Sequence, residues 1–248
     1  MPKIEKINYS KGVSMGATQE AVKKHFTQDQ IKEIIDSIRM RVQSCASLRK
    51  FEPYDFIRET KVKFITCDDL GHDVEIGEAS LFFVNGNLAH YTYNCALFHV
   101  FDACSQDLCD IYRAFFKKAE WIDQVRNCEI FTYDALYLDY ICLNPEYRGY
   151  GIGRILAMGL IEEFGKEGEI VIAWPIPVEL QENEGIRVVE FQPEKKAVTR
   201  KLVRMCESLG FIRLSQSNML FLPRTEQYPS VAQILKKMFP ANRNTSAA

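Results

Sequence analysis

The stretch Leu143-Asn144-Pro145-Glu146-Tyr147-Arg148-Gly149-Tyr150-Gly151-Ile152-Gly153-Arg154 decides the fold of this chain. An apolar run over 134–143 leads into it, and a helical pattern over 153–165 follows it. The order of strand, glycine-rich turn and helix brings backbone N–H groups and the positive end of a helix dipole to one point. This order predicts an anion-binding turn at the end of a buried strand.

Three glycines at alternate positions, Gly149, Gly151 and Gly153, form this turn. Glycine lets the backbone approach a bound group closely and adopt a positive φ without a Cβ penalty. Arg148 and Arg154 add positive charge on either side. The spacing differs from the dinucleotide fingerprint G-x-G-x-x-G, and no Gly-Lys-Ser/Thr follows as in a P-loop. A pyrophosphate wrapped by backbone amides is the predicted ligand.

Composition excludes several classes of protein. With 248 residues, 47% of them hydrophobic, the chain is long enough to bury a substantial core. A net charge of −2 gives no overall positive field, so we expect no nucleic-acid partner. The eight cysteines contain no C-x-x-C pair and the four histidines lack ligand spacing, so no metal site is predicted. Without a signal peptide or an apolar stretch of about 18 residues, the chain is expected to be cytoplasmic and to have no membrane partner.

Two helices are predicted before the turn. Apolar residues recur at helical spacing over 28–48 and again within 96–119. Asp102 or Ser105 is the candidate N-cap within the second segment. Its many aromatic residues are expected to pack in the core.

Strands are predicted on both sides of the turn. Segments 61–67 and 74–84 flank the turn residues Asp68–Gly71 and should pair as a hairpin. Segment 169–174 follows the helix, and a strand–helix–strand unit of this length normally joins parallel or near-neighbour strands. The segment 175–193 interrupts the regular pattern.

The last part of the chain reads as short elements. A helix from Val198 should end at a glycine cap on Gly210. Short strands over 211–214 and 219–222 and a small terminal helix within 231–239 are predicted, and 241–248 should be disordered.

Here the sequence resembles a known family. Asn144–Arg154 is similar to the acetyl-CoA motif, R/Q-x-x-G-x-G/A, of the GCN5-related N-acetyltransferases (GNAT), and Leu209-Gly210-Phe211 follows in the family's usual order. The resemblance covers 61–84 and 134–222.

The resemblance implies an α/β (α+β) fold: a GNAT-like splayed mixed β-sheet flanked by helices. The fourth strand, 134–143, and the fifth, 169–174, would separate to admit the cofactor. One domain is expected over 1–240, with an N-terminal helical extension in 1–60 and a helical insertion in 90–130 before the fourth core strand.

The implied co-substrate is acetyl-CoA, or coenzyme A after transfer. Its pyrophosphate would bind the turn, and its pantetheine arm would pair with the fourth strand, where the N–H of Cys142 or Leu143 is the expected donor to the thioester carbonyl. Thr199 stands where many family members have an asparagine. The residues assigned to the cofactor are Ile141, Cys142, Leu143, Arg148, Gly149, Tyr150, Gly151, Ile152, Gly153, Arg154 and Thr199.

Transfer to an amine requires a base, because an ammonium must lose a proton before it attacks. By strand alternation Asp139 should share one face with Tyr137, Ile141 and Leu143, which makes it the best-placed candidate. The alternative is a structural carboxylate paired with a neighbouring cation. Glu78 is the second choice.

Many members carry a tyrosine four residues before the glycine of L-G-F, as the acid for the leaving thiolate. Cys206 occupies that position here. The thiol itself, Tyr137, Tyr140 or a water molecule are the candidate donors, and a buried structural cysteine is the alternative role of Cys206.

The predicted function is therefore an acetyl-CoA-dependent N-acetyltransferase that acts by direct attack in a ternary complex. The acceptor is an amine of a small molecule or a protein, and the acidic segment 175–193 would suit a cation. The alternative is a non-catalytic acyl-CoA-binding regulatory or scaffold protein. A homodimer is compatible with the sequence.

Overall fold

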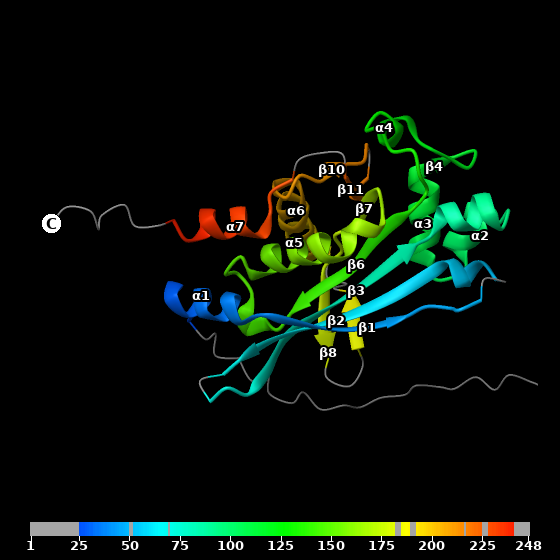
Figure 1. Cartoon of the computed structure of the whole chain (residues 1–248). Coiled ribbons are helices and arrows are strands. Elements are labelled where there is room, and N and C mark those ends of the chain that lie inside the picture. The colour runs from blue at the N-terminus through cyan, green and yellow to red at the C-terminus, as the bar shows by residue number, and fades with distance from the viewer. Residues whose placement is uncertain are drawn as a thin grey trace, which may run out of the picture.

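A seven-stranded mixed sheet flanked by helices forms the centre of the computed structural model, an α/β architecture (Figure 1). The structure describes residues 25–49, 52–68, 70–181, 185–188, 192–215, 217–224 and 228–240. The sheet order is β1-β2-β3-β6-β7-β11-β10. Its strands are β1 (Arg39–Cys45), β2 (Ile57–Cys67), β3 (Asp73–Val84), β6 (Ala135–Leu143), β7 (Ile170–Ala173), β10 (Ile212–Arg213) and β11 (Leu220–Pro223).

Helices cover both faces of this sheet. The buried apolar side chains form two hydrophobic cores, one on each face. The helices that contribute to the first core are α1 (Gln28–Ser37), α5 (Ile152–Phe164), α6 (Gln192–Ser208) and α7 (Val231–Met238). The helices that contribute to the second core are α2 (Leu97–Asp102), α3 (Gln106–Phe115) and α4 (Asp123–Arg126). Shorter elements are η1 (Pro53–Phe56), η2 (Leu88–Thr92), η3 (Pro145–Tyr147), η4 (Gly165–Glu167), β4 (Phe116–Lys117), β5 (Glu120–Trp121), β8 (Val178–Gln181) and β9 (Gly185–Val188).

The central strands are apolar on both faces, because they lie between two layers of helices. In β7, Val171 and Ala173 belong to the first core, on the side of α5, whereas Ile170 and Ile172 belong to the second core, on the side of α3. This alternation is the period of two that a strand imposes on its side chains. The sheet is therefore the wall between two separate cores.

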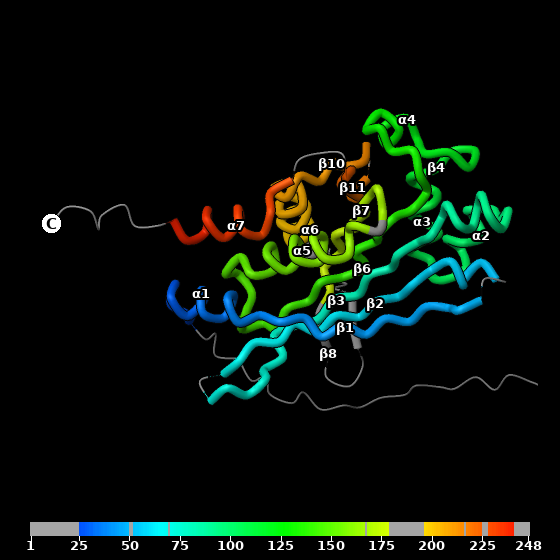
Figure 2. Tube along the Cα trace, in the orientation of Figure 1, coloured from blue at the N-terminus to red at the C-terminus, as the bar shows by residue number. Residues whose placement is uncertain are grey.

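Several predictions of local structure are confirmed. β2 and β3 form an antiparallel hairpin, and β6 and β7 pair in parallel through the helix between them. Ser105 caps α3 by accepting a hydrogen bond from the N–H of Leu108. Figure 2 lets the chain be followed from β6 through α5 back to β7.

Other predictions are wrong. The helix expected over 28–48 ends at Ser37, and Arg39–Cys45 instead pairs with β2 along its whole length. The reason is tertiary. Of the residues at helical spacing in α1, Ile31 and Ile35 are buried, whereas the residues after Ser37 gain backbone hydrogen bonds from the edge of β2. The segment 96–119 is broken into α2 and α3, and 175–193 contains the hairpin β8–β9, which the sequence did not indicate.

Some expectations concern residues outside the described part of the chain. These are the beginning of the N-terminal extension, the tail 241–248 and the glutamates Glu182, Glu184 and Glu190. Among the described residues, no helix is long and apolar enough to cross a membrane.

The contact between β3 and β6 yields a stability prediction. A Cβ added to Gly77 would clash with the carbonyl oxygen of Cys142, whereas one added to Gly159 would meet nothing within 4 Å. Gly77→Ala should therefore destabilise the fold by about 1–3 kcal/mol. Gly159→Ala, inside α5, should stabilise it by about 0.5–1 kcal/mol. Urea unfolding measures both, and equal effects of the two variants would contradict this close packing.

Candidate functional site

The strands β6 and β7 separate halfway along β6. Their parallel pairing joins Ala135–Leu138 to Ile170–Ala173 and stops there. β6 continues to Leu143, whereas the chain after β7 leaves the sheet in a tight turn in which the N–H of Ile176 donates to the carbonyl of Trp174 at 2.8 Å. The edge of β6 from Asp139 to Leu143 is consequently not paired with β7, and a gap opens beside it.

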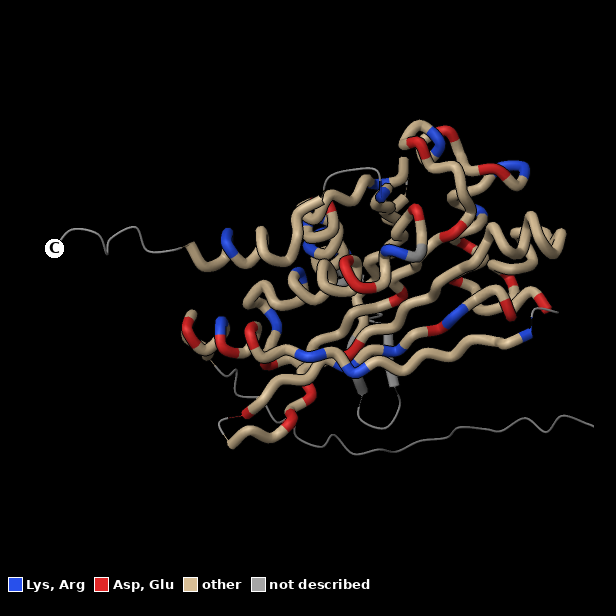
Figure 3. The backbone as a smooth tube through the Cα atoms, in the orientation of Figure 1, with Lys and Arg blue, Asp and Glu red and all other residues tan. Residues whose placement is uncertain are grey.

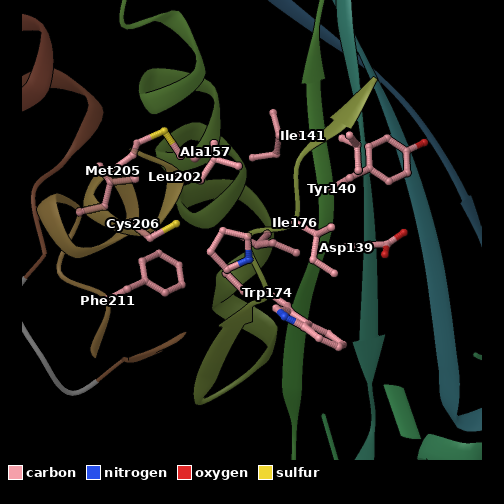
Figure 4. Close-up of a pocket in the computed structure, with 15 residues that line it drawn as sticks. Asp139, Tyr140, Ile141, Ala157, Trp174, Ile176, Leu202, Met205, Cys206 and Phe211 are labelled. Carbon is pink, nitrogen blue, oxygen red and sulfur yellow. The ribbon is translucent and has the colours of Figure 1, made fainter. Parts of the chain in front are cut away.

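An apolar pocket occupies this gap (Figure 4). Its volume is about 80 Å³, several times the roughly 10–15 Å³ that one water molecule requires on the same measure. Apolar side chains of β6, α5, α6 and the segment after β7 make up most of its wall. The lining residues are Leu138, Asp139, Tyr140, Ile141, Ala157, Ala173, Trp174, Pro175, Ile176, Val178, Leu202, Met205, Cys206, Leu209 and Phe211.

The two sides of β6 differ in chemistry at this pocket. Figure 4 shows Ile141 directed toward Met205 and Leu202, while the polar ends of Asp139 and Tyr140 point away from Cys206. The pocket therefore has an apolar wall beneath α6, whereas the carboxylate of Asp139 and the hydroxyl of Tyr140 lie on the other side of β6.

The glycine turn lies at the end of β6 and opens α5. Gly149 and Gly151 have φ values of 91° and 82°, which only glycine adopts without strain. A Cβ at Gly149 would meet nothing within 4 Å, so the space beside its backbone is open. The first N–H groups of α5 have no partner within the helix. The turn therefore has an open backbone at Gly149 and the positive helix end that an anion needs, while the side chain of Met238 lies against Gly151.

Two arginines flank the turn, as predicted. The Nε atom of Arg148 donates to the carbonyl of Leu143 at 2.7 Å, which folds the side chain back over the end of β6. Arg154 donates to the carbonyl of Ser208 at 3.4 Å, and its Nε atom is buried without a hydrogen-bond partner. Arg154 therefore ties the start of α5 to the end of α6 and retains an unsatisfied donor.

Three predicted cofactor residues have other contacts. The hydroxyl of Tyr150 accepts from the N–H of Phe26 at 3.3 Å, so this side chain positions the start of α1. The side chain of Ile152 is fully buried in the core, which leaves only its backbone for a ligand. Thr199 lines a separate hollow on α6 with Lys196 and other residues, and not the pocket beside β6.

A β-bulge places Asp139. Ser80 of β3 pairs with Tyr140 and Leu81 pairs with Leu138, so Asp139 is an extra residue on β6. The expectation that Asp139, Tyr137, Ile141 and Leu143 share one face is wrong. Tyr137 packs in the core beneath α3, whereas Ile141 and Leu143 pack on the side of α5, because the bulge reverses the alternation.

The environment of Asp139 makes it a weaker acid than usual. Burial, with smaller contributions from the negative charges of Asp107 and Glu59, raises the pKa of Asp139 to about 6 from its ordinary value of 3.8. A hydrogen bond with the Ser80 side chain opposes the shift. No cation pairs with Asp139 among the described residues, so the structural role considered for it is not observed.

The tyrosines near Asp139 differ. Tyr137 is 2% exposed and stacks on Phe82 with ring centroids 6.3 Å apart, so it is a core residue and does not line the pocket. Tyr140 lines the pocket and donates its hydroxyl to Glu78 at 3.1 Å. Burial, together with the Glu78 carboxylate, raises the pKa of Tyr140 well above its ordinary range. Tyr140 and Glu78 thus form a hydrogen-bonded pair close to Asp139.

Cys206 lies in the apolar wall. It is 8% exposed, and burial raises the pKa of its thiol to about 12. Transfer of a proton from this thiol to an ordinary thiolate, of pKa about 8.5, would be uphill. Cys206 therefore serves packing better than proton donation.

The sequence predicted that the segment 175–193 lies beside the cleft but did not indicate which of its residues form the wall. Trp174, Pro175 and Ile176 lie beside β6 because the chain turns sharply there, and β8 then approaches β6 closely enough for the Cys142 thiol to donate to the carbonyl of Val178 at 3.8 Å. The two prolines at 175 and 177 signalled the end of the strand but not the direction of the turn.

Comparison with family models, with curated proteins and with solved structures finds no match to this chain.

The raised pKa of Asp139 predicts a pH-dependent stability. The folded state binds this proton more tightly than the unfolded state, so the associated stability is present below about pH 4 and is lost as the pH rises through about 6. Asp139→Asn should remove the loss and raise the free energy of unfolding near pH 8 by up to about 3 kcal/mol, with little effect near pH 4. Denaturant unfolding at both pH values measures this. The exposed Asp36→Asn is the control, and a destabilised Asp139→Asn near pH 8 would contradict the prediction.

Proposed function

We propose that this chain is an acyl-CoA-dependent N-acetyltransferase with a GNAT-like active site. The observation that carries the proposal is the separation of β6 from β7 directly beside the glycine turn that opens α5. A strand edge that β7 leaves after Leu138 suits an amide-bearing arm, and the turn suits a diphosphate. One ligand, coenzyme A, has both groups.

Residues of the pocket and the turn would hold this co-substrate. The open backbone at Gly149 and the N–H groups of Gly151, Ile152 and Gly153 would bind the pyrophosphate, with positive charge from Arg154. The edge of β6 from Asp139 to Leu143 would hydrogen-bond the pantetheine amides. Acetyl-CoA would supply an activated acyl group at the apolar pocket. We do not assign Thr199 or the Tyr150 side chain to it, because their contacts lie elsewhere.

The polar side of β6 is then the acceptor side. Asp139 and Glu78 carry carboxylates there, and Asp107 and Glu59 lie near enough to raise the pKa of Asp139. An amine that approaches is protonated at neutral pH and favours negative surroundings. With a pKa of about 6, Asp139 is ionised at neutral pH and basic enough to accept the amine proton. A backbone N–H of β6 at Cys142 or Leu143 would stabilise the developing oxyanion.

The alternative, a non-catalytic acyl-CoA-binding protein, is favoured by one observation. Cys206 stands at the position of the family's usual acid, and burial raises the pKa of its thiol to about 12. Release of free thiol from acetyl-CoA in the presence of a panel of amines supports the enzyme. Tight binding without release supports the alternative.

Binding can be tested with a matched pair of glycine variants. Gly149 and Gly71 both have positive φ, and a Cβ at either position would meet no protein atom within 4 Å. Both alanine variants should therefore lose similar stability, of about 1 kcal/mol. Only Gly149→Ala should weaken coenzyme A binding, by at least about tenfold, because its Cβ fills space that we assign to the pyrophosphate. Isothermal titration calorimetry measures the affinity. Absence of coenzyme A binding to the wild type at high micromolar concentration would refute the proposed function.

Catalysis can be tested at Asp139. We expect Asp139→Asn to lower kcat by about 10²–10⁴-fold while coenzyme A affinity is retained, because a general base of this kind contributes that much. The wild-type rate should rise with pH through about 6, the pKa of Asp139, and then level off. Cys206→Ala should keep most of its turnover. Stopped assays of free thiol between pH 5 and 9 measure these rates, and an unchanged kcat in Asp139→Asn would exclude it as the base.

A further inference from the structure

The outer edge of β1 is exposed. β1 is the first strand in the sheet order, and β2 is its only neighbour among the described residues. All seven residues of Arg39–Cys45 are exposed, and their register with β2 is regular, without a bulge. Natural sheets usually protect such an edge with a bulge, a proline, unpaired charges or a covering element. β1 contains neither a bulge nor a proline.

The charges of β1 do not protect this edge either. Arg39 and Arg41 both pair with Asp73 of β3, at 2.7 and 3.2 Å. Their guanidinium groups are therefore held toward the sheet of their own chain. Figure 3 shows basic positions along β1 and acidic positions on the hairpin of β2 and β3.

The opposite face of β1 is apolar at its centre. Met40 and Val42 are 38% and 47% exposed, and they lie on the same face as Phe64 and Val62, their partners on β2. That face is the one that α1 covers farther into the sheet. Exposed apolar side chains beside an open strand edge suit the same surface of a second copy.

We propose that β1 pairs with β1 of a second copy, antiparallel and centred on Val42, to form one continuous sheet across a two-fold axis. This register uses all seven residues and sets Arg41 opposite Gln43 and Arg39 opposite Cys45. A register centred on Arg41 would set the two Arg41 residues opposite each other, and one centred on Met40 would set Arg39 opposite Arg41. Like charges directly opposite are destabilising, so the sequence favours the centre at Val42.

The area of the proposed interface determines the expected affinity of the dimer. A seven-residue strand is about 24 Å long, and an interface of one strand pair with its flanking side chains falls at the small end of stable protein interfaces. The dimer should therefore be weak, with a dissociation constant on the order of 10 µM. The pocket beside β6 is independent of this interface, because β2 and β3 lie between β1 and β6.

Sedimentation velocity of the full chain from about 1 to 200 µM tests association. The mean mass should rise from 28.6 kDa toward twice that value. Val42→Lys should remain monomeric throughout, because it sets two like charges opposite each other. Leu70→Lys is the control, since Leu70 is 80% exposed in the turn between β2 and β3. Circular dichroism verifies that both variants fold. A wild type that is monomeric at 200 µM, or a Val42→Lys variant that associates like the wild type, overturns the proposal.

Cysteine cross-linking tests the register. In a Cys45→Ser background, Val42→Cys should form a disulfide-linked dimer on mild oxidation, because directly opposed Cα atoms lie about 4.5–5.5 Å apart. Ser44→Cys should not cross-link to itself, since the two copies of residue 44 would be offset by about 14 Å. Equal cross-linking of both variants, or none by Val42→Cys, overturns the centre at Val42.

Discussion

The structure depends on how β6 is held along its length. At its first four residues β6 pairs with β3 and with β7, and beyond Leu138 β3 is the strand of the sheet with which it pairs among the described residues. The close approach of Gly77 to the backbone of Cys142 keeps this second half attached to the sheet. The gap beside β6 therefore exists because β3 holds β6 in place while β7 turns away.

The bulge at Asp139 falls at the point where β6 and β7 separate. It places a carboxylate at the gap and reverses the faces of all residues that follow. The apolar side chains Ile141 and Leu143 consequently face α5, while Asp139 and Tyr140 face the opposite side. A single extra residue thus sets an apolar side of β6, facing the pocket, against an acidic side, and burial of Asp139 raises the pKa of its carboxyl to about 6.

The additions to the sheet have different consequences. The segment that contains α2, α3 and α4 fills the second core with aromatic side chains such as Phe101, Phe115 and Trp121. It therefore packs against one face of the sheet and places Asp107 near Asp139. β1, in contrast, extends the sheet without being buried, and its exposed edge makes it a surface for pairing and not a part of the core.

The sequence by itself determined the elements with local signals. Alternating glycines predicted the turn before α5, an apolar run predicted β6, and the turn residues between β2 and β3 predicted their hairpin. These predictions were possible because positive φ angles and burial on both faces depend on residue types that are adjacent in the chain. Only the tertiary structure decided that Arg39–Cys45 is a strand, that Asp139 is the extra residue of a bulge and that Tyr137 is buried. These outcomes depend on hydrogen bonds and packing supplied by β2, β3 and α3. Because those elements are distant in the chain, their contacts produce no periodic pattern of residue types within the segments themselves.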